Sequence, residues 1–192
     1  VAGLVVTIAF AAGAADTAHH WGYGGEHGPK EWGDMDPAFA QCKLGRLQSP
    51  IDIRNATPSP LPALEFQYAD TSAETVNNGH TIQVNLANGG VLNLDNVPYT
   101  LVQFHFHTPS EERINGKAYP MVAHFVHQNA EGELAVVAVL LKEGNANAAY
   151  GPVFENLPQT EGARKPLGAT LNAVDLLPTE RGYFKFVGSL TT

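Results

Sequence analysis

The sequence predicts a β-dominated α+β domain. From Gln48 onward, short runs rich in apolar and β-branched residues alternate with turns that contain glycine and asparagine. Such runs are typical of strands, and the turn residues tolerate the positive φ of tight connections. The stretch 145–156 is compatible with a short helix, which Gly151-Pro152 should interrupt. We therefore expect strands to dominate and helices to be few and small.

The expected strands follow one another along the second half of the chain. In order they are 81–86, 91–94, 101–107, 121–127 and 134–141. The turn signals around them are Asn77-Asn78-Gly79, Asn88-Gly89-Gly90, Asn115-Gly116, Glu131-Gly132 and Glu143-Gly144. The proline-rich stretch 57–62 is interpreted as an irregular surface connection.

The size and charge of the chain limit the function classes. With 192 residues, 44% hydrophobic and 16% charged, it is long enough for one domain with a sizeable core. A formal net charge of −8 argues against general affinity for nucleic acid or anionic membrane surfaces, because both would repel it. Nothing in the sequence indicates an oligomeric state.

The segment 1–15 resembles part of an export signal. It carries no charge, and Ala12-Gly13-Ala14 offers a small-residue cleavage site. A membrane span needs roughly 20 apolar residues, and this segment is shorter than that. No stable membrane insertion is expected once the signal is removed. The alternative is a buried helix or strand. Since the segment lacks an initiator Met and a basic start, we expect a partial signal and a periplasmic or secreted protein.

The main chemical signal is Gln103-Phe104-His105-Phe106-His107. Side chains at i and i+2 of a strand leave by the same face, so both imidazoles should point together. His124 lies in a second strand-like run, and three imidazoles converge if the two strands are neighbours. Three protein ligands with an open fourth position are typical of a catalytic zinc site. The alternative is a set of ordinary strand histidines with satisfied hydrogen bonds.

The sequence around these histidines resembles that of the α-class carbonic anhydrases. The matching runs are QFHFHTPSE at 103–111, MVAHFVHQN at 121–129, RLQSPIDI at 46–53, HHWGYGGEHGPKEWG at 19–33, NNGH at 77–80, ELAVVAVLLKEG at 133–144 and GSLTT at 188–192. The resemblance covers 18–192 as one domain. It implies a large, twisted, mostly antiparallel central sheet with small peripheral helices.

The resemblance also implies the reaction and the residues that perform it. A zinc-bound hydroxide would hydrate carbon dioxide reversibly to bicarbonate and a proton. His105, His107 and His124 would be the zinc ligands, and Gln103 would orient His105. For catalysis, His80 would shuttle protons, and Glu111 and Thr191 would orient the hydroxide. The residues expected to contact the substrate are Val126, Val136, Leu190 and Thr192. Tyr23 and Asn78 would hold ordered water.

Two substitutions depart from the family pattern. Val122 stands where relatives usually carry a glutamate that accepts a hydrogen bond from the third ligand, so we expect weaker zinc retention. Glu112 stands where many relatives carry a histidine, which should alter local hydrogen bonding without removing a reacting group. His127 is expected to be structural.

The resemblance further implies an incomplete carboxyl-terminal end. Relatives continue past the segment that matches Thr192, and many pair a cysteine there with the counterpart of Cys42. We therefore expect a fragment that folds poorly and has low activity. The rival function is a non-catalytic carbonic anhydrase-like binding domain. Three retained ligands with Glu111 and Thr191 favour the enzyme, and no His-Glu-x-x-His motif supports another metal hydrolase.

Overall fold

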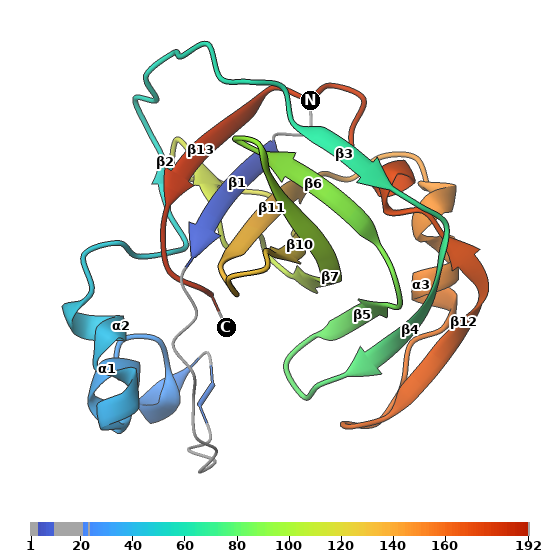
Figure 1. The fold of residues 1–192 in the computed structure, drawn as a ribbon. Helices are drawn as coiled ribbons and strands as arrows, with labels where there is room; N and C mark the ends of the chain where they lie inside the picture. Colours follow the sequence, from blue (N-terminus) through green and yellow to red (C-terminus); the bar gives the residue numbers. More distant parts are fainter. Residues whose placement is uncertain (1–3, 10–20, 23, 192) are drawn as a thin grey trace.

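A large sheet forms the body of the protein (Figure 1). The computed structural model describes residues 4–9, 21–22 and 24–191. Within them, ten strands form one sheet whose main path runs β12-β4-β5-β7-β10-β11-β1-β13, with β6 pairing β3 and β7. The strands are β1 (Leu4–Ala9), β3 (Glu65–Tyr68), β4 (Thr71–Asn77), β5 (Ile82–Leu86), β6 (Gly90–Leu94), β7 (Val97–His107), β10 (Met121–Gln128), β11 (Leu134–Leu141), β12 (Arg164–Leu171) and β13 (Tyr183–Val187).

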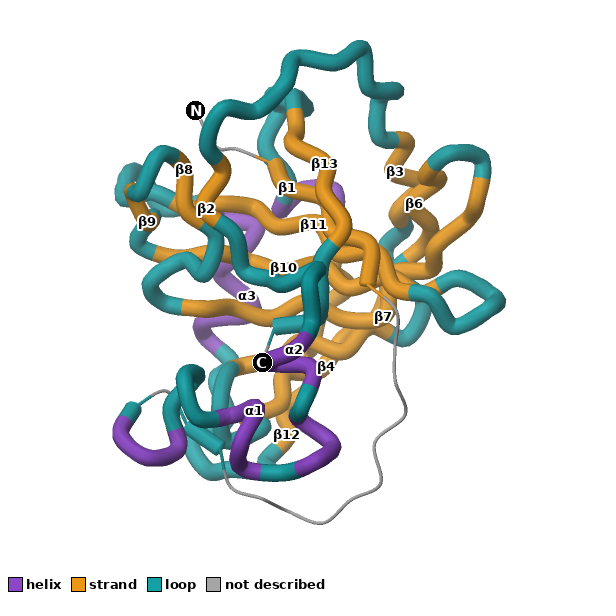
Figure 2. The backbone as a smooth tube through the Cα atoms, turned by 90° about the vertical axis from the view of Figure 1, so that its left-hand side faces the viewer, coloured by secondary structure: helices purple, strands orange, loops and turns teal. Residues whose placement is uncertain are grey.

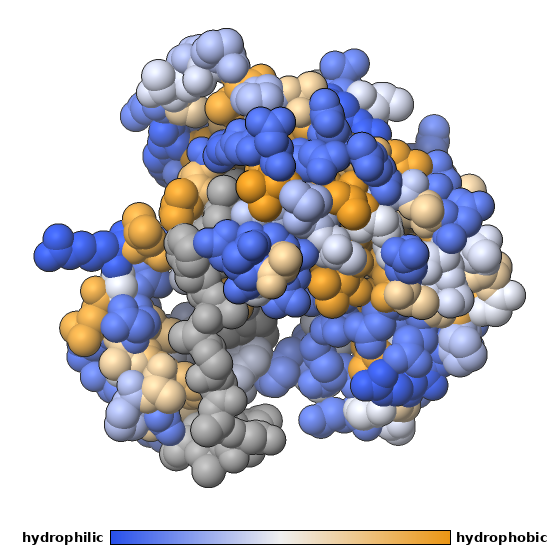
Figure 3. Space-filling view, in the orientation of Figure 1, coloured by the Kyte–Doolittle hydropathy of each residue, from blue (hydrophilic) through white to orange (hydrophobic). Residues whose placement is uncertain are grey.

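Smaller elements lie around this sheet (Figure 2). A second sheet, β2-β8-β9, uses β2 (Asp52–Ile53), β8 (Arg113–Ile114) and β9 (Lys117–Ala118). The helices are α1 (Trp32–Met35), α2 (Gln41–Leu44), α3 (Gly151–Glu155) and the 3-10 turns η1 (Gly25–His27), η2 (Pro37–Phe39), η3 (Ala148–Tyr150) and η4 (Ala173–Leu176). No helix in the described ranges is long and apolar enough to cross a membrane. In Figure 3, hydrophilic side chains cover most of the visible face and hydrophobic ones form small groups.

The predicted fold class is confirmed. Every pairing in the large sheet is antiparallel except β1 with β13. All five expected strands are present, and the expected helix appears as η3 and α3. Pro152 lies in the first turn of α3 rather than interrupting it, because the N–H it lacks has no intrahelical partner there. The sequence analysis missed β3, β4, β12 and β13.

The amino-terminal segment has a place in the sheet. Leu4–Ala9, expected as part of an export signal, forms β1 between β11 and β13. It pairs antiparallel with β11 and parallel with β13, so backbone groups on both of its edges are used. The strand alternative is thus the conformation found here. Removal of this segment during export stays a prediction.

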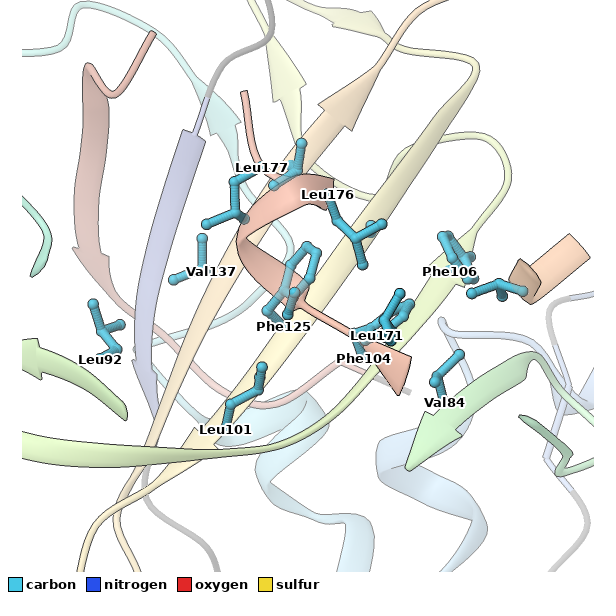
Figure 4. Packing of buried hydrophobic residues seen from close by; sticks show 14 of the residues in the cluster. Val84, Leu92, Leu101, Phe104, Phe106, Phe125, Val137, Leu171, Leu176 and Leu177 are labelled. Carbon is cyan, nitrogen blue, oxygen red and sulfur yellow. The ribbon is translucent and has the colours of Figure 1, made fainter. Parts of the chain in front are cut away.

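One face of the sheet carries the main hydrophobic core (Figure 4). Phe104 and Phe125 have no exposed surface and stack with ring centroids 5.2 Å apart. Leu176 of η4 and the adjacent Leu177 pack over them. Alternation along the strands then directs the intervening residues to the opposite face.

A bulge in β7 decides which residues reach that opposite face. The pairing with β10 runs from Gln103 opposite Val126 to Leu101 opposite His127, so Val102 is the extra residue. Val102 is 44% exposed, whereas Leu101 and Phe104 on either side of it are both in the core. A bulge shifts the alternation by one residue and is common beside active sites. Here Phe104 lies in the core, and His105 and His107 after it point to the opposite face of the sheet.

Candidate metal centre

Two central strands bring the three predicted histidines together. His105 on β7 lies directly opposite His124 on β10, and His107 lies opposite Val122. The ring centroids are 5.1 Å apart for His105 and His107, 5.4 Å for His105 and His124, and 4.9 Å for His107 and His124. One candidate ligand atom from each imidazole lies within 4.8 Å of the others. The convergence expected from the i, i+2 spacing is therefore present.

Hydrogen bonds fix which nitrogen each ring turns inward. His105 Nδ1 lies 2.9 Å from Gln103 Oε1, and His124 Nε2 lies 3.2 Å from Glu112 Oε2. Amide and carboxylate oxygens accept, so these nitrogens donate and the lone pairs sit on His105 Nε2 and His124 Nδ1. His107 Nε2 is buried with no hydrogen-bond partner. These three nitrogens form the inner set.

Electrostatics keep the ligand nitrogens available at neutral pH. Burial, reinforced by repulsion from His124, lowers the pKa of His105 to about 3 and that of His107 to about 4. Both imidazoles are therefore neutral near pH 7. A neutral imidazole carries the lone pair that a transition metal needs, and nitrogen ligands of this kind suit zinc, copper, iron and nickel. The donor set and the orphaned His107 Nε2 fit a bound metal ion.

Glu111 lies beside the inner nitrogens. Its Oε2 is 3.6 Å from His107 Nε2 and 3.9 Å from His124 Nδ1, and this one oxygen is buried with no hydrogen-bond partner. Burial raises the pKa of Glu111, while a hydrogen bond with the Thr191 side chain partly offsets this. Glu111 and Thr191, expected as a pair, do contact each other.

Glu112, to which the sequence analysis assigned no function, contacts a ligand directly. Its carboxylate and His124 are each 3% exposed, and they form the 3.2 Å contact described above. Burial opposes ionisation, but the hydrogen bond and charge of His124 outweigh it and lower the pKa of Glu112. The sequence analysis expected no acceptor for His124 at position 122, and the loop after β7 supplies one from outside the strand.

The described residues expected to contact carbon dioxide lie on β10, on β11 and in the terminal segment. Val126 on β10 and Val136 on β11 are direct cross-strand partners and half-buried. Leu190 is 48% exposed. It follows Ser189, whose hydroxyl accepts a 2.9 Å hydrogen bond from the Ser49 N–H. The terminal segment is thereby attached to the loop before β2.

The expected shuttle lies on the surface. His80 is exposed and stacks on Trp21, with centroids 3.8 Å apart and planes 12° apart. Asn78 Oδ1 accepts from the N–H groups of His80 and Thr81 at 3.1 and 2.8 Å. Asn78 is exposed and uses its side chain to close this turn. The expected sites at Tyr23 and Thr192 lie outside the described residues.

Two polar residues beside the cluster were missed. Gln83 on β5 lies opposite His105, and Asn85 lies opposite Gln103. Gln83 Nε2 donates to Asn85 Oδ1 at 2.7 Å. Their period-2 spacing in an otherwise apolar strand was a visible signal, but only the pairing of β5 with β7 connects it to the histidines.

Comparison with known proteins gives a consistent result. The profile described as "Eukaryotic-type carbonic anhydrase" matches residues 27–192. A carbonic anhydrase of Pectobacterium carotovorum is 42% identical over 98% of this chain and 77% of its own length. The Photobacterium profundum α-carbonic anhydrase is 46% identical, with a TM-score of 0.84 over 90% of this chain and 78% of its own.

A second solved structure extends the likeness to a more distant source. The α-carbonic anhydrase from Thermovibrio ammonificans, solved with the inhibitor sulfanilamide, is 40% identical. Its TM-score is 0.87 over 92% of this chain and 79% of its own. Profile, sequence relatives and fold agree over nearly the whole chain. The protein belongs to the eukaryotic-type, or α, carbonic anhydrase family.

Proposed function

We propose that this protein is a zinc lyase that hydrates carbon dioxide reversibly to bicarbonate and a proton. The observation that carries the proposal is the inward set of nitrogens: His105 Nε2, His107 Nε2 and His124 Nδ1 converge while Gln103 and Glu112 occupy two of the outer nitrogens. Bound zinc lowers the pKa of a water molecule to about 7 and so supplies a nucleophile at neutral pH.

The residues around the ligands have separate tasks in this proposal. The Thr191 hydroxyl, held by Glu111, orients the nucleophile so that a lone pair rather than a proton faces carbon dioxide. Val126, Val136 and Leu190 form an apolar wall that receives carbon dioxide without offering it a hydrogen bond. Thr192 and Tyr23 are proposed to border the pocket on the strength of the sequence resemblance.

Proton export is assigned to His80. An imidazole ordinarily titrates near neutral pH and can therefore accept and release a proton during each turnover. Support comes from its exposed position, where it can exchange protons with buffer, and from Trp21, which holds the ring by stacking. Asn78 fixes the turn that carries His80.

The test is carbon dioxide hydration by zinc-loaded protein, with His107→Ala as the matched variant. We expect one zinc per wild-type chain and hydration well above the uncatalysed rate, both lost in His107→Ala. Wild-type protein that binds zinc stoichiometrically yet gives only the background rate would instead favour the non-catalytic binding domain. Retention of one tightly held zinc by His107→Ala would overturn the ligand assignment.

We further infer a periplasmic or secreted location. The support is the uncharged segment 1–15 with its small-residue site at Ala12-Gly13-Ala14. Mass spectrometry of the protein from the natural host should give a mature amino terminus near Asp16, in the periplasmic or culture fraction. An unprocessed chain confined to the cytosol would contradict this.

A further inference from the structure

The third ligand lacks an acceptor on its own strand. Val122 lies two residues before His124, on the same face of β10, and can accept no hydrogen bond. It has no exposed surface and packs with Ile53, Ala138 and Leu140 in a small apolar cluster. This position therefore contributes packing, and the outer nitrogen of His124 needs a partner from elsewhere.

The partner comes from the loop between β7 and β8. Glu112 Oε2 lies 3.2 Å from His124 Nε2, and both side chains are 3% exposed, so water cannot readily replace either group. The loop is fixed at Ser110, whose hydroxyl donates to the Glu112 carbonyl at 2.7 Å. The same hydroxyl accepts from the Tyr119 N–H at 2.8 Å. Ser110 thus connects the Glu112 backbone before the β8-β9 hairpin to Tyr119 after it, which fixes the loop that carries the carboxylate.

Two consecutive carboxylates bracket one imidazole. Glu111 Oε2 lies 3.9 Å from His124 Nδ1, on the inner side, whereas Glu112 Oε2 lies on the outer side at Nε2. A ring that donates from Nε2 keeps its lone pair on Nδ1, which faces His107 and His105. The reverse tautomer would point a proton into the cluster and leave Glu112 without a donor.

We propose that Glu112 is the positioning residue for His124: its carboxylate fixes the Nδ1 lone pair toward the metal, in place of an acceptor on β10 at Val122. Partners of this kind orient a ligand and raise its basicity, and losing one typically costs about 10–100-fold in metal affinity or activity. The inference rests on the proposed function for the identity of the metal. Zinc retention should therefore be ordinary for such a site, contrary to the expectation drawn from Val122.

The test measures zinc release from loaded protein to an excess of chelator in four variants. Glu112→Leu removes the acceptor and should release zinc about 10–100-fold faster than wild type. Glu112→Gln keeps an acceptor oxygen without charge, so its rate should lie between the two. Val122→Glu alone should not slow release, because His124 Nε2 is already engaged. The double variant Glu112→Leu/Val122→Glu places a carboxylate on the same face of β10 as His124. Its zinc release should therefore return most of the way to the wild-type rate.

A spectroscopic measurement separates positioning from general stability. Nitrogen chemical shifts of the His124 ring in zinc-loaded wild type should report Nε2 protonated and Nδ1 metal-bound. In Glu112→Gln, which matches the native shape, the Nε2–H should shift and exchange faster with solvent while the other two ligand rings are unchanged. Unchanged His124 signals in this variant would overturn the inference.

The outcomes for the inference and for the proposed function are distinct. Wild-type protein that hydrates carbon dioxide while Glu112→Leu releases zinc at the wild-type rate overturns the inference alone. Slower release in Val122→Glu than in wild type would also overturn it, because it would show that Nε2 lacked an adequate acceptor. Wild-type protein that holds zinc but hydrates no carbon dioxide overturns the function and leaves the release order as evidence for Glu112.

Discussion

Strand β10 carries two buried histidines that the protein uses in opposite ways. His124 turns one nitrogen to Glu112 and leaves the other facing His105 and His107. His127, three residues on and on the core side, satisfies both nitrogens: Nδ1 donates to the Ala135 carbonyl at 3.0 Å and Nε2 accepts from the Tyr68 hydroxyl at 2.5 Å. Burial alone therefore does not identify a metal ligand. The candidate metal ligand is the buried imidazole that keeps one nitrogen free of hydrogen bonds.

The largest expected difference is in zinc binding. His124→Ala removes a ligand, so the loss of zinc should exceed the roughly 10–100-fold cost of losing an outer partner alone. His127→Leu, the matched change at a buried histidine of the same strand, should keep one zinc per chain. Metal analysis after dialysis measures both. Equal zinc loss in the two variants would contradict the distinction between these histidines.

The second difference is in the pH dependence of stability. Burial lowers the pKa of His127 to about 4 from its ordinary value of 6.5, although hydrogen bonds with backbone groups oppose the shift. The unfolded chain thus binds the proton more readily, and stability is complete above pH 6.5 and falls as the pH drops toward 4. At about 1.4 kcal/mol per pKa unit, the loss between pH 7 and pH 5 should be about 2 kcal/mol.

Urea unfolding at the two pH values measures this loss. His105 and His107 also have lowered pKa values and contribute in metal-free protein. The part due to His127 is therefore the difference between wild type and His127→Leu, which retains the other two. A wild type and variant with the same pH dependence would show that His127 titrates normally.

A third effect, of similar size, concerns the Tyr68 hydroxyl. His127→Leu leaves this hydroxyl without an acceptor and should cost about 1–3 kcal/mol of unfolding free energy at pH 7. Adding Tyr68→Phe removes the stranded hydroxyl, so the double variant should recover part of that cost. Thermal or urea unfolding decides it. A double variant that is less stable than His127→Leu would show that packing, not the hydrogen bond, dominates here.

The smallest effect on the folded protein is expected at an exposed histidine. His80→Ala should change neither zinc content nor unfolding free energy, because His80 is exposed and lies outside the hydrophobic core and the histidine cluster. Turnover should fall in weak buffer and recover with added imidazole, since the lost function is proton export. Stopped-flow hydration at low and high buffer concentration tests this. An unchanged rate in weak buffer would remove His80 from the proposed function.

Strand alternation and the family resemblance together predicted the histidine cluster from the sequence, but neither indicated that Glu112 contacts it. His105 and His107 share a face because strand residues alternate, and this holds whichever strands are neighbours. The phase of that face depends on the bulge at Val102, which no local signal marked. Glu112 lies in an irregular loop, where no periodicity indicates direction. Its contact with His124 depends on the anchoring of Ser110 by Tyr119.

The missed strands have the same explanation. β4 and β12 pair across roughly ninety residues of chain, and Glu74 and Arg164 form an ion pair between them. Polar residues such as Glu74, Lys165 and Thr170 interrupt the apolar alternation in both strands. β12 is an edge strand and β4 is its neighbour, and both are stabilised by partners that a local pattern does not contain. β10 and β11 were predictable because their residues are mainly apolar and most of them are buried.

The position of β1 gives the proposed export processing a consequence for the sheet. Leu4–Ala9 hydrogen-bonds β11 on one side and β13 on the other, so it is the only connection between them along the sheet in the described chain. Cleavage after Ala14 would withdraw that ribbon and expose two facing rows of unpaired amides and carbonyls, a template for any extended peptide. A chain processed in this way would need another strand to pair these two edges. The timing of proteolysis would then control whether the product stays dispersed or self-associates.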